Sequence, residues 1–173
     1  MAIVPQEGFL FSGTVLDNLR FRRPEMPRND VIAVAKELGT HEAIAKLSRG
    51  YDTEVREGGA SVSEGQRQLI SITRALIADP AILILDEPTS SLDVHTESIL
   101  QAALEHLVKD RTTILIAHRL STVRKADRII VLDRGKITES GTHDELMRKN
   151  GHYSALARQS SARGTFDEPA DLS

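Results

Sequence analysis

Two adjacent carboxylates, Asp86 and Glu87, follow an apolar run and give the strongest chemical signal in the sequence. The run, Ala81–Leu85, is bounded by turn signals and predicts a strand that is buried on both faces. Ligands gather at the carboxyl ends of strands in open parallel sheets, and neighbouring side chains there point in different directions. One carboxylate can therefore hold Mg²⁺ through water, while the other orients or deprotonates an attacking water. Taken alone, the pattern fits a surface turn before Pro88 equally well.

A second group of residues opens a predicted helix over residues 64–78. Ser63 precedes the helix, and Gly65 and Gln66 lie in its first turn. The start of a helix offers unpaired backbone N–H groups and the positive end of the dipole, and both attract phosphate. Gly65 lets the backbone approach a ligand closely. Ser63 by itself is explained by an N-cap alone.

Three further polar residues, His118, Asp93 and Gln6, are candidates only in combination. His118 follows a predicted strand over residues 112–117 and falls at the same end of the sheet as the two carboxylates. An imidazole there can donate to a phosphate oxygen or sense it. Asp93 is explained by a helix cap, and Gln6 by an ordinary polar position. The order and spacing of the whole set therefore carry the argument.

The elements that must position these residues alternate between strands and helices. Helical periodicity is predicted over 30–47 with an interruption at Gly39, over 64–78, and from Asp93 to about 109. Buried strands are predicted over 81–85, 112–117 and 128–132, and a turn at 133–135 leads to a hairpin partner over 136–140. Residues 1–23 are expected to be a short extended piece followed by loop and turns, and 51–60 a loop. A capping box of Thr142 and Glu145 predicts a short helix, and another follows near 152–159. This order is typical of a parallel sheet with helices packed on it.

Composition excludes several classes of protein. The chain has 173 residues, 40% hydrophobic and 27% charged, which suits one globular domain with a sizeable core. A net charge of −3 and 3% aromatic residues leave no basic field and few stacking platforms for nucleic acid. No apolar run approaches the roughly 20 residues that span a bilayer. The absence of cysteine excludes disulfides, thiolate metal sites and a cysteine nucleophile.

The order of these motifs resembles the ATP-binding-cassette (ABC) ATPase domain, most closely the exporter branch of that family. Val4-Pro5-Gln6 resembles its glutamine loop, Val62–Gln66 its signature sequence, and Ile82–Glu87 its Walker B strand with the adjoining glutamate. Ser91–Asp93 resembles the D-loop, and His118 the switch histidine. Residues 8–14 and 53–59 are also similar to exporter sequences. The resemblance covers residues 3 to about 160, and five motifs in the family's order make it specific.

The resemblance implies an α/β fold class, with a P-loop-NTPase-like parallel sheet, flanking helices and a helical subdomain. The implied reaction is hydrolysis of ATP to ADP and phosphate with Mg²⁺, which powers export across a membrane. The implied location is the cytoplasmic face of that membrane, reached through a transmembrane domain that is not in this chain.

The resemblance also implies roles for the candidate residues. Asp86 is expected to hold Mg²⁺ through water, and Glu87 to polarise the attacking water. Gln6 is expected to touch the metal and the water and to couple them to a transmembrane transport domain. His118 would contact the γ-phosphate, and Asp93 would help to join two sites. The residues that would close on ATP held by a second ATPase domain, in a head-to-tail dimer, are Ser63, Gly65 and Gln66.

The sequence departs from the family pattern at three places. Glu64 stands where the signature usually has Gly, and we expect it to turn outward at the helix N-terminus. Arg56 stands where the preceding segment often has Gly. No Gly-x-x-x-x-Gly-Lys-Ser/Thr occurs in these 173 residues, although the family carries this phosphate-cradling Walker A loop upstream of the glutamine loop. The expected organisation is a partial ABC ATPase domain over 1–160 with its N-terminal part missing. It comprises a helical subdomain at about 13–78 and core at 79–160, and a disordered tail follows over 161–173.

Two consequences follow from the missing Walker A loop. The isolated chain is expected to be inactive, because phosphoryl transfer depends on positioning and charge stabilisation that half a site cannot supply. A missing strand and helix are also expected to expose apolar surface and a strand edge, which favours self-association.

Two other functions remain open at this point. A truncated, non-catalytic remnant or regulator fits the same residues. An ABC ATPase of the DNA-repair or chromosome-maintenance type fits less well, because long heptad segments and a basic field are lacking, and no nucleic-acid partner is expected. The cluster Arg20–Arg23 is too short to indicate a lipid-binding site and is interpreted as a solvated face.

Overall fold

The computed structural model describes residues 1–6, 8–59, 61–86, 94–109, 111–116 and 123–162, in two compact units, Met1–Ile116 and Ala117–Ser173. The first unit contains the strands β1 (Ala2–Val4), β2 (Gly13–Thr14), β3 (Glu54–Val55), β4 (Ile82–Asp86) and β5 (Thr112–Ile116). Its α-helices are α1 (Val15–Leu19), α2 (Arg28–Glu37), α3 (His41–Ala45), α4 (Glu64–Ile77) and α5 (Val94–Val108), and its 3₁₀ turns are η1 (Gly50–Asp52) and η2 (Glu57–Gly59). The second unit contains β6 (Ile129–Asp133), β7 (Lys136–Gly141), α7 (His143–Lys149) and α8 (His152–Ala162).

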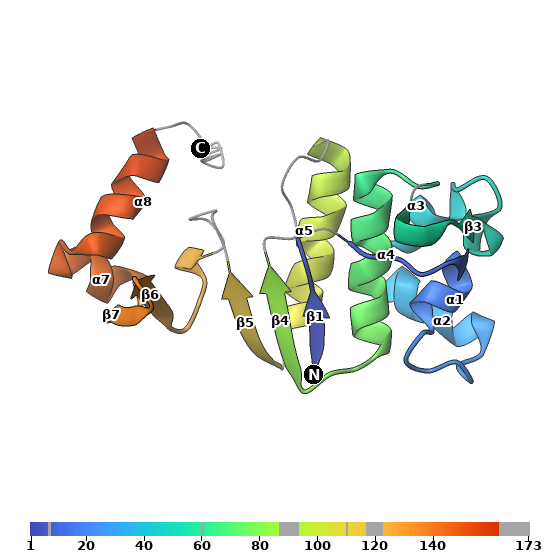
Figure 1. Cartoon of the computed structure of the whole chain (residues 1–173), viewed down its shortest axis with the longest axis horizontal. Helices are drawn as coiled ribbons and strands as arrows, with labels where there is room; N and C mark the ends of the chain where they lie inside the picture. The colour runs from blue at the N-terminus through green and yellow to red at the C-terminus, as the bar shows by residue number, and fades with distance from the viewer. Residues whose placement is uncertain (7, 60, 87–93, 110, 117–122, 163–173) are drawn as a thin grey trace, which may run out of the picture. The chain divides into compact units, whose positions relative to one another are not determined.

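A parallel sheet with strand order β1-β4-β5 forms the centre of the first unit. The register sets Val4 beside Leu85 and Asp86 beside Ile116. The three strands point in one direction, and α4 begins at the end of the sheet where they finish (Figure 1). This arrangement confirms the α/β fold class with a parallel sheet and flanking helices. The predicted domain boundaries remain predictions.

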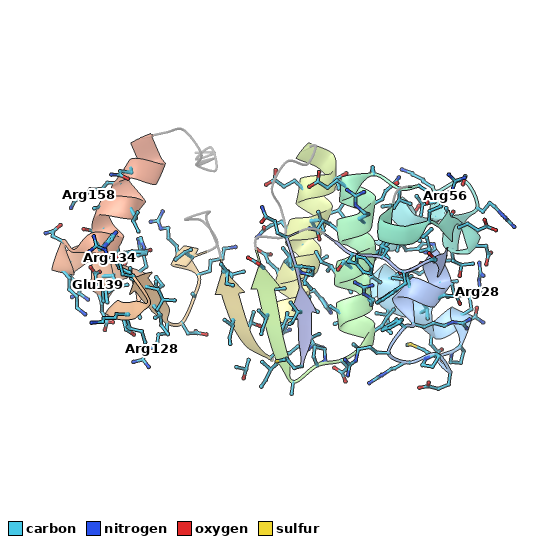
Figure 2. The ribbon with its side chains drawn as sticks, viewed as in Figure 1. Arg28, Arg56, Arg128, Arg134, Glu139 and Arg158 are labelled. Atoms are coloured by element: carbon cyan, nitrogen blue, oxygen red, sulfur yellow. The ribbon has the colours of Figure 1, made fainter. Side chains whose placement is uncertain are left out.

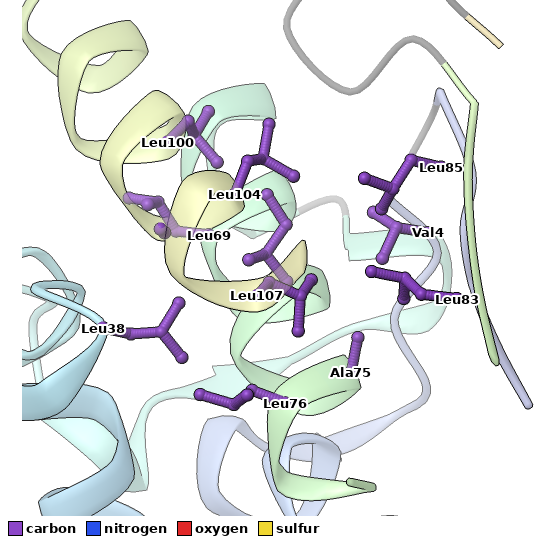
Figure 3. Packing of buried hydrophobic residues seen from close by; sticks show 12 residues of the cluster. Val4, Leu38, Leu69, Ala75, Leu76, Leu83, Leu85, Leu100, Leu104 and Leu107 are labelled. Carbon is purple, nitrogen blue, oxygen red and sulfur yellow. The ribbon is translucent and has the colours of Figure 1, made fainter. Parts of the chain in front are cut away.

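Helix α4 joins two hydrophobic cores. Its residues Leu69 and Ile72 pack with α5 and with Val4, Leu83 and Leu85 of the strands, on one face of the sheet (Figure 3). Its other buried residues Ile70 and Ile77 belong to a second core, shared with α1, α2 and α3. Apolar residues on nearly every side of α4 therefore tie the sheet to the helical subdomain.

The expectation that β4 and β5 are buried on both faces is wrong. Ile82 is 42% exposed, Ile114 54% and Ile3 of β1 55%. Side chains alternate between the two faces of a strand, and in the described residues α4 and α5 cover only the face that carries Leu83 and Leu85. The opposite face of the sheet is an exposed isoleucine surface.

The helical subdomain contains an element that the sequence reading missed. Residues 15–19 were expected to be loop, yet they form α1, with Thr14 and Asp17 in a capping box. Thr14 Oγ1 accepts a hydrogen bond from Asp17 N at 3.1 Å, and Asp17 Oδ2 accepts one from Thr14 N at 3.2 Å. The predicted helix over 30–47 is present as α2 and α3, broken at Gly39, which has a φ of +73°. On the outer side of the subdomain, Arg28 donates two hydrogen bonds to Asp52, at 2.6 and 2.9 Å (Figure 2).

The second unit is a β-hairpin followed by two helices. The strands β6 and β7 pair antiparallel around the turn at Arg134-Gly135, as the sequence predicts. The capping box is also present, because Thr142 Oγ1 accepts from Glu145 N while Glu145 Oε2 accepts from Thr142 N. Glu139 of β7 accepts hydrogen bonds from His152 N and Tyr153 N at the start of α8 (Figure 2). No described helix is both long enough and apolar enough to cross a membrane.

Candidate functional site

Asp86 and Gln6 lie at the carboxyl edge of the parallel sheet. The last pair between β1 and β4 is Val4 with Leu85, so Asp86 is one residue and Gln6 two residues beyond this pair. Asp86 is half-buried and Gln6 is exposed. The structure thus places both residues at the carboxyl ends of neighbouring strands.

The start of α4 supplies the second part of the site. Ser63 Oγ accepts a hydrogen bond from Gln66 N at 3.3 Å, and Gln66 Oε1 accepts one from Ser63 N at 2.9 Å. These bonds form the N-terminal cap predicted for Ser63. Gly65 is buried, whereas Glu64 is exposed, which agrees with the expectation that the glutamate turns outward. The free N–H groups of this first turn can bind an anion.

Three predicted site residues, Glu87, Asp93 and His118, lie outside the described residues. Strand β4 ends at Asp86, α5 begins at Val94, and β5 ends at Ile116. The roles of the three residues therefore stay predictions.

The donor set fits Mg²⁺. Among the residues that the structure describes, no three acidic or histidine side chains gather into a metal cluster. Mg²⁺ in nucleotide sites is usually held by one or two carboxylates together with phosphate oxygens and water. A single half-buried carboxylate at Asp86, at the carboxyl end of β4, matches that requirement.

Two side chains of α4 that sequence reasoning missed hold the residues after β1. Gln68 Nε2 donates to the backbone carbonyls of Pro5, at 3.4 Å, and Gln6. Arg74 Nη2 donates to the carbonyl of Phe9 at 2.8 Å. Burial lowers the pKa of the Arg74 guanidinium. One sequence signal could have identified Gln68: it lies on the apolar face of α4 with Leu69, Ile72 and Leu76. A polar side chain on a buried face needs a hydrogen-bond partner.

Three phenylalanine rings form an aromatic cluster beside the same segment, and two of them line a pocket. The rings of Phe11 and Phe21 stack with centroids 4.3 Å apart, and Phe9 meets Phe11 edge-on at 5.1 Å. Arg74 lies 5.9 Å from the centre of the Phe11 ring. Phe11, Phe21 and Arg74 line a pocket of about 340 Å³ together with Arg22. All three phenylalanines remain at least 40% exposed, so the Arg20–Arg23 cluster is part of an aromatic surface as well as a charged one.

Comparison with known proteins identifies the family of the chain. The ABC transporter family model matches residues 1–90. An uncharacterized ABC transporter ATP-binding protein of Bacillus subtilis, YknV, is 52% identical over 158 residues, which are 91% of this chain and 26% of that protein. A putative multidrug export ATP-binding/permease protein of Staphylococcus aureus strain RF122 is 49% identical over 90% of the chain and 27% of its own length.

A solved structure is similar as well. A bacterial Atm1-family ABC exporter with ATP bound superposes with a TM-score of 0.81 at 42% identity, covering 92% of this chain and 28% of the exporter chain. The present chain thus spans about a quarter of the length of the relatives it matches. Since the family model covers more than half of it, the chain belongs to the ABC transporter family, and it corresponds to part of the ATPase domain of exporter-type members.

Proposed function

We propose that this chain supplies catalytic and nucleotide-contacting residues to the ATPase domain of an ABC exporter, which hydrolyses ATP to ADP and phosphate. The observation that carries the proposal is the position of Asp86 and Gln6 at the carboxyl ends of two neighbouring parallel strands, in a chain that matches the ABC transporter family model over residues 1–90. The solved exporter with ATP bound supports the choice of nucleotide. The exporter names of the relatives favour transport over DNA repair.

Each residue has a separate task in this proposal. Asp86 holds Mg²⁺ through water, and Gln6 contacts the same ion and the attacking water. Bound Mg²⁺ neutralises charge on the phosphates, while Glu87 polarises the water and His118 donates to the γ-phosphate. Ser63, Gly65 and Gln66 direct the N-terminal end of α4 at ATP held by a second ATPase domain, and Asp93 joins the two sites. In this proposal the two ATPase domains form a head-to-tail dimer, and the dimer lies at the cytoplasmic face of the membrane beside the transmembrane transport domain.

The chain alone should hydrolyse no ATP at a useful rate. A Walker A motif does not occur in its sequence, so the triphosphate lacks its main cradle. We expect phosphate release from Mg²⁺-ATP to equal that of the Glu87→Gln variant. Turnover comparable to an intact ATPase domain would refute this part of the proposal.

A binding experiment tests the positive part of the proposal. The complete ATPase domain of the Bacillus subtilis relative, with its catalytic glutamate replaced by glutamine to retain ATP, is mixed with this chain. We expect a complex in analytical ultracentrifugation that requires Mg²⁺-ATP, because the start of α4 closes on nucleotide held by the other domain. A complex that forms equally well without nucleotide, or no complex at all, contradicts the role of Ser63, Gly65 and Gln66.

The membrane domain of the exporter is the proposed partner of the aromatic surface. Phe9 and Phe11 follow the Gln6 segment directly, so a domain that covers them also touches the residues that contact metal and water. We expect the permease part of the Staphylococcus aureus relative to bind the chain and to lose binding with Phe21→Ser. The matched control is Leu156→Ser, which removes a side chain of similar exposure from the second unit. Equal binding by both variants contradicts this assignment.

A further inference from the structure

The segment between β1 and Leu10 lies along α4, and it contains Gln6. For brevity, residues 5, 6, 8 and 9 are called the Gln6 loop. It contacts α4 from Gln68 to Arg74, six residues or about 9 Å along the helix axis. The hydrogen bonds from α4 side chains to the backbone carbonyls of the Gln6 loop constrain the position of this loop, in addition to the backbone bend that follows β1.

Gln68 makes the contact nearest to Gln6. Its side chain is only 2% exposed, and burial of an amide is costly unless its polar atoms are paired. The Nε2 atom donates to the carbonyls of both Pro5 and Gln6. Two carbonyl acceptors fix which end of the amide faces the loop, since the oxygen of the amide would be repelled there.

The oxygen atom of the Gln68 amide also indicates that the bonds from Nε2 to the Gln6 loop are the reason for a glutamine at this position. Gln68 Oε1 is buried and has no hydrogen-bond partner among the residues that the structure describes. An apolar side chain of similar length would fill the same space without that penalty. The bonds from Nε2 to the Gln6 loop are the polar interactions that offset the cost of this residue.

Gly8 shows that the contact is close as well as hydrogen-bonded. A Cβ atom at Gly8 would lie 3.0 Å from the carbonyl carbon and oxygen of Arg67 and 3.3 Å from the backbone nitrogen of Gln68. The backbone of the loop therefore rests closely on the backbone of the helix, and a side chain at Gly8 would require one of the two to shift. The bond from Arg74 to the Phe9 carbonyl holds the loop on the far side of Gly8.

We propose that Gln68 is a positioning residue for Gln6. Its amide fastens the backbone of Gln6 to α4, five residues after Ser63, so that the Gln6 loop and the start of α4 keep one relative position. The inference rests on the proposed roles of Gln6 and Ser63. In that function Gln6 serves the nucleotide at its own sheet edge, while Ser63 serves nucleotide on a second domain. Gln68 thereby connects a residue of one site to a residue of the other.

Hydrogen exchange on the whole chain tests the inference without nucleotide, so its outcome is separate from that of the proposed ATPase function. In Gln68→Met, which keeps the length and loses the donor, we expect peptides covering residues 1–12 to exchange about tenfold faster, as for the loss of one net hydrogen bond. Peptides of α5 should be unchanged. Gln101→Met, on α5, is the matched control and should leave the exchange of residues 1–12 as in the wild type.

A second variant separates positioning from space filling. Gln68→Glu has the same size, but its carboxyl can donate to the loop carbonyls only when protonated. We expect wild-type protection of residues 1–12 at about pH 5.5 and its loss near pH 8, after correction for intrinsic exchange. Gln68→Met at the same two pH values controls for other titrating groups. Wild-type exchange in Gln68→Met, or protection in Gln68→Glu that is independent of pH, overturns the inference. If Gln68→Met fails to fold, the pH comparison within Gln68→Glu alone decides.

Discussion

Replacement of Ser63 separates the structural role of the α4 cap from its proposed contact with phosphate. In Ser63→Ala the hydrogen bond from Gln66 N to Ser63 Oγ, 3.3 Å long, is lost. The reciprocal bond from Ser63 N to Gln66 Oε1 uses the backbone and can survive. Loss of an N-cap side chain lowers the free energy of unfolding by about 0.5–2 kcal/mol. Because the reciprocal bond can survive, we expect a loss of about 1 kcal/mol. For a chain of this size, that loss lowers Tm by about 2–4 °C.

Ser63→Asp has the opposite pattern of effects. Aspartate is as good an N-cap as serine and interacts favourably with the helix dipole, so we expect the free energy of unfolding to stay near the wild-type value. Its negative charge would face the γ-phosphate of ATP on the second domain. We therefore expect Ser63→Asp to abolish the ATP-dependent complex, whereas Ser63→Ala only weakens it.

The assays are urea denaturation followed by circular dichroism, and the sedimentation experiment with the ATP-loaded relative. Thr142→Ala is the matched control, because Thr142 and Glu145 form the same capping box in the second unit and have no proposed phosphate contact. Thr142→Ala should lower the free energy of unfolding by about 1 kcal/mol, as Ser63→Ala does, and leave complex formation intact. The reasoning fails if Ser63→Asp is less stable than Ser63→Ala, or if Ser63→Asp forms the ATP-dependent complex as well as the wild type does.

The remaining predictions concern stability and association. Leu83→Ala should lower the free energy of unfolding in urea by about 2–5 kcal/mol, because Leu83 is fully buried between sheet and helices. Ile82→Ala, on the exposed face of the same strand, should cost about 1 kcal/mol or less, and equal losses would contradict the assignment of faces. The wild-type chain should self-associate in sedimentation velocity through its isoleucine surface, and Ile116→Lys should raise the monomer fraction; a wild-type chain that is wholly monomeric opposes this. The hydrogen bond from Thr142 N holds the pKa of Glu145 below its ordinary value of 4.5, so its stabilisation is present above that pH and is lost as the pH falls through the folded pKa. Glu145→Gln should remove this part of the acid dependence in pH-dependent unfolding, and an unchanged acid profile would show that the bond does not form.

The local elements around the site could be predicted from the sequence. Ser63 and Gln66 are three residues apart, and their reciprocal bonds need only the helix that they begin, so the cap of α4 was predictable. The apolar run before Asp86 was long enough to indicate β4. The helix α1 was missed, because five residues show too little periodicity, although Thr14 and Asp17 carried the same capping signal.

Contacts between distant parts of the chain could not be predicted in this way. The apolar and β-branched runs over 81–85 and 112–117 correctly predicted strands at β4 and β5, but only the packing of α4 and α5 decided that one face is buried and the other exposed. Gln68 meets Gln6 across 62 positions of sequence, and Phe11 meets Phe21 across the whole of α1. Caps and turns arise from interactions within a few residues, and the apolar runs of the strands can be recognised locally, so the sequence determined where these elements lie, whereas the pairing of the parallel strands joins distant segments. The hydrogen bonds between the Gln6 loop and α4 join two segments that are far apart in the sequence. These segments become neighbours only because α4 packs against both the sheet and the helical subdomain, so tertiary structure alone decided this contact.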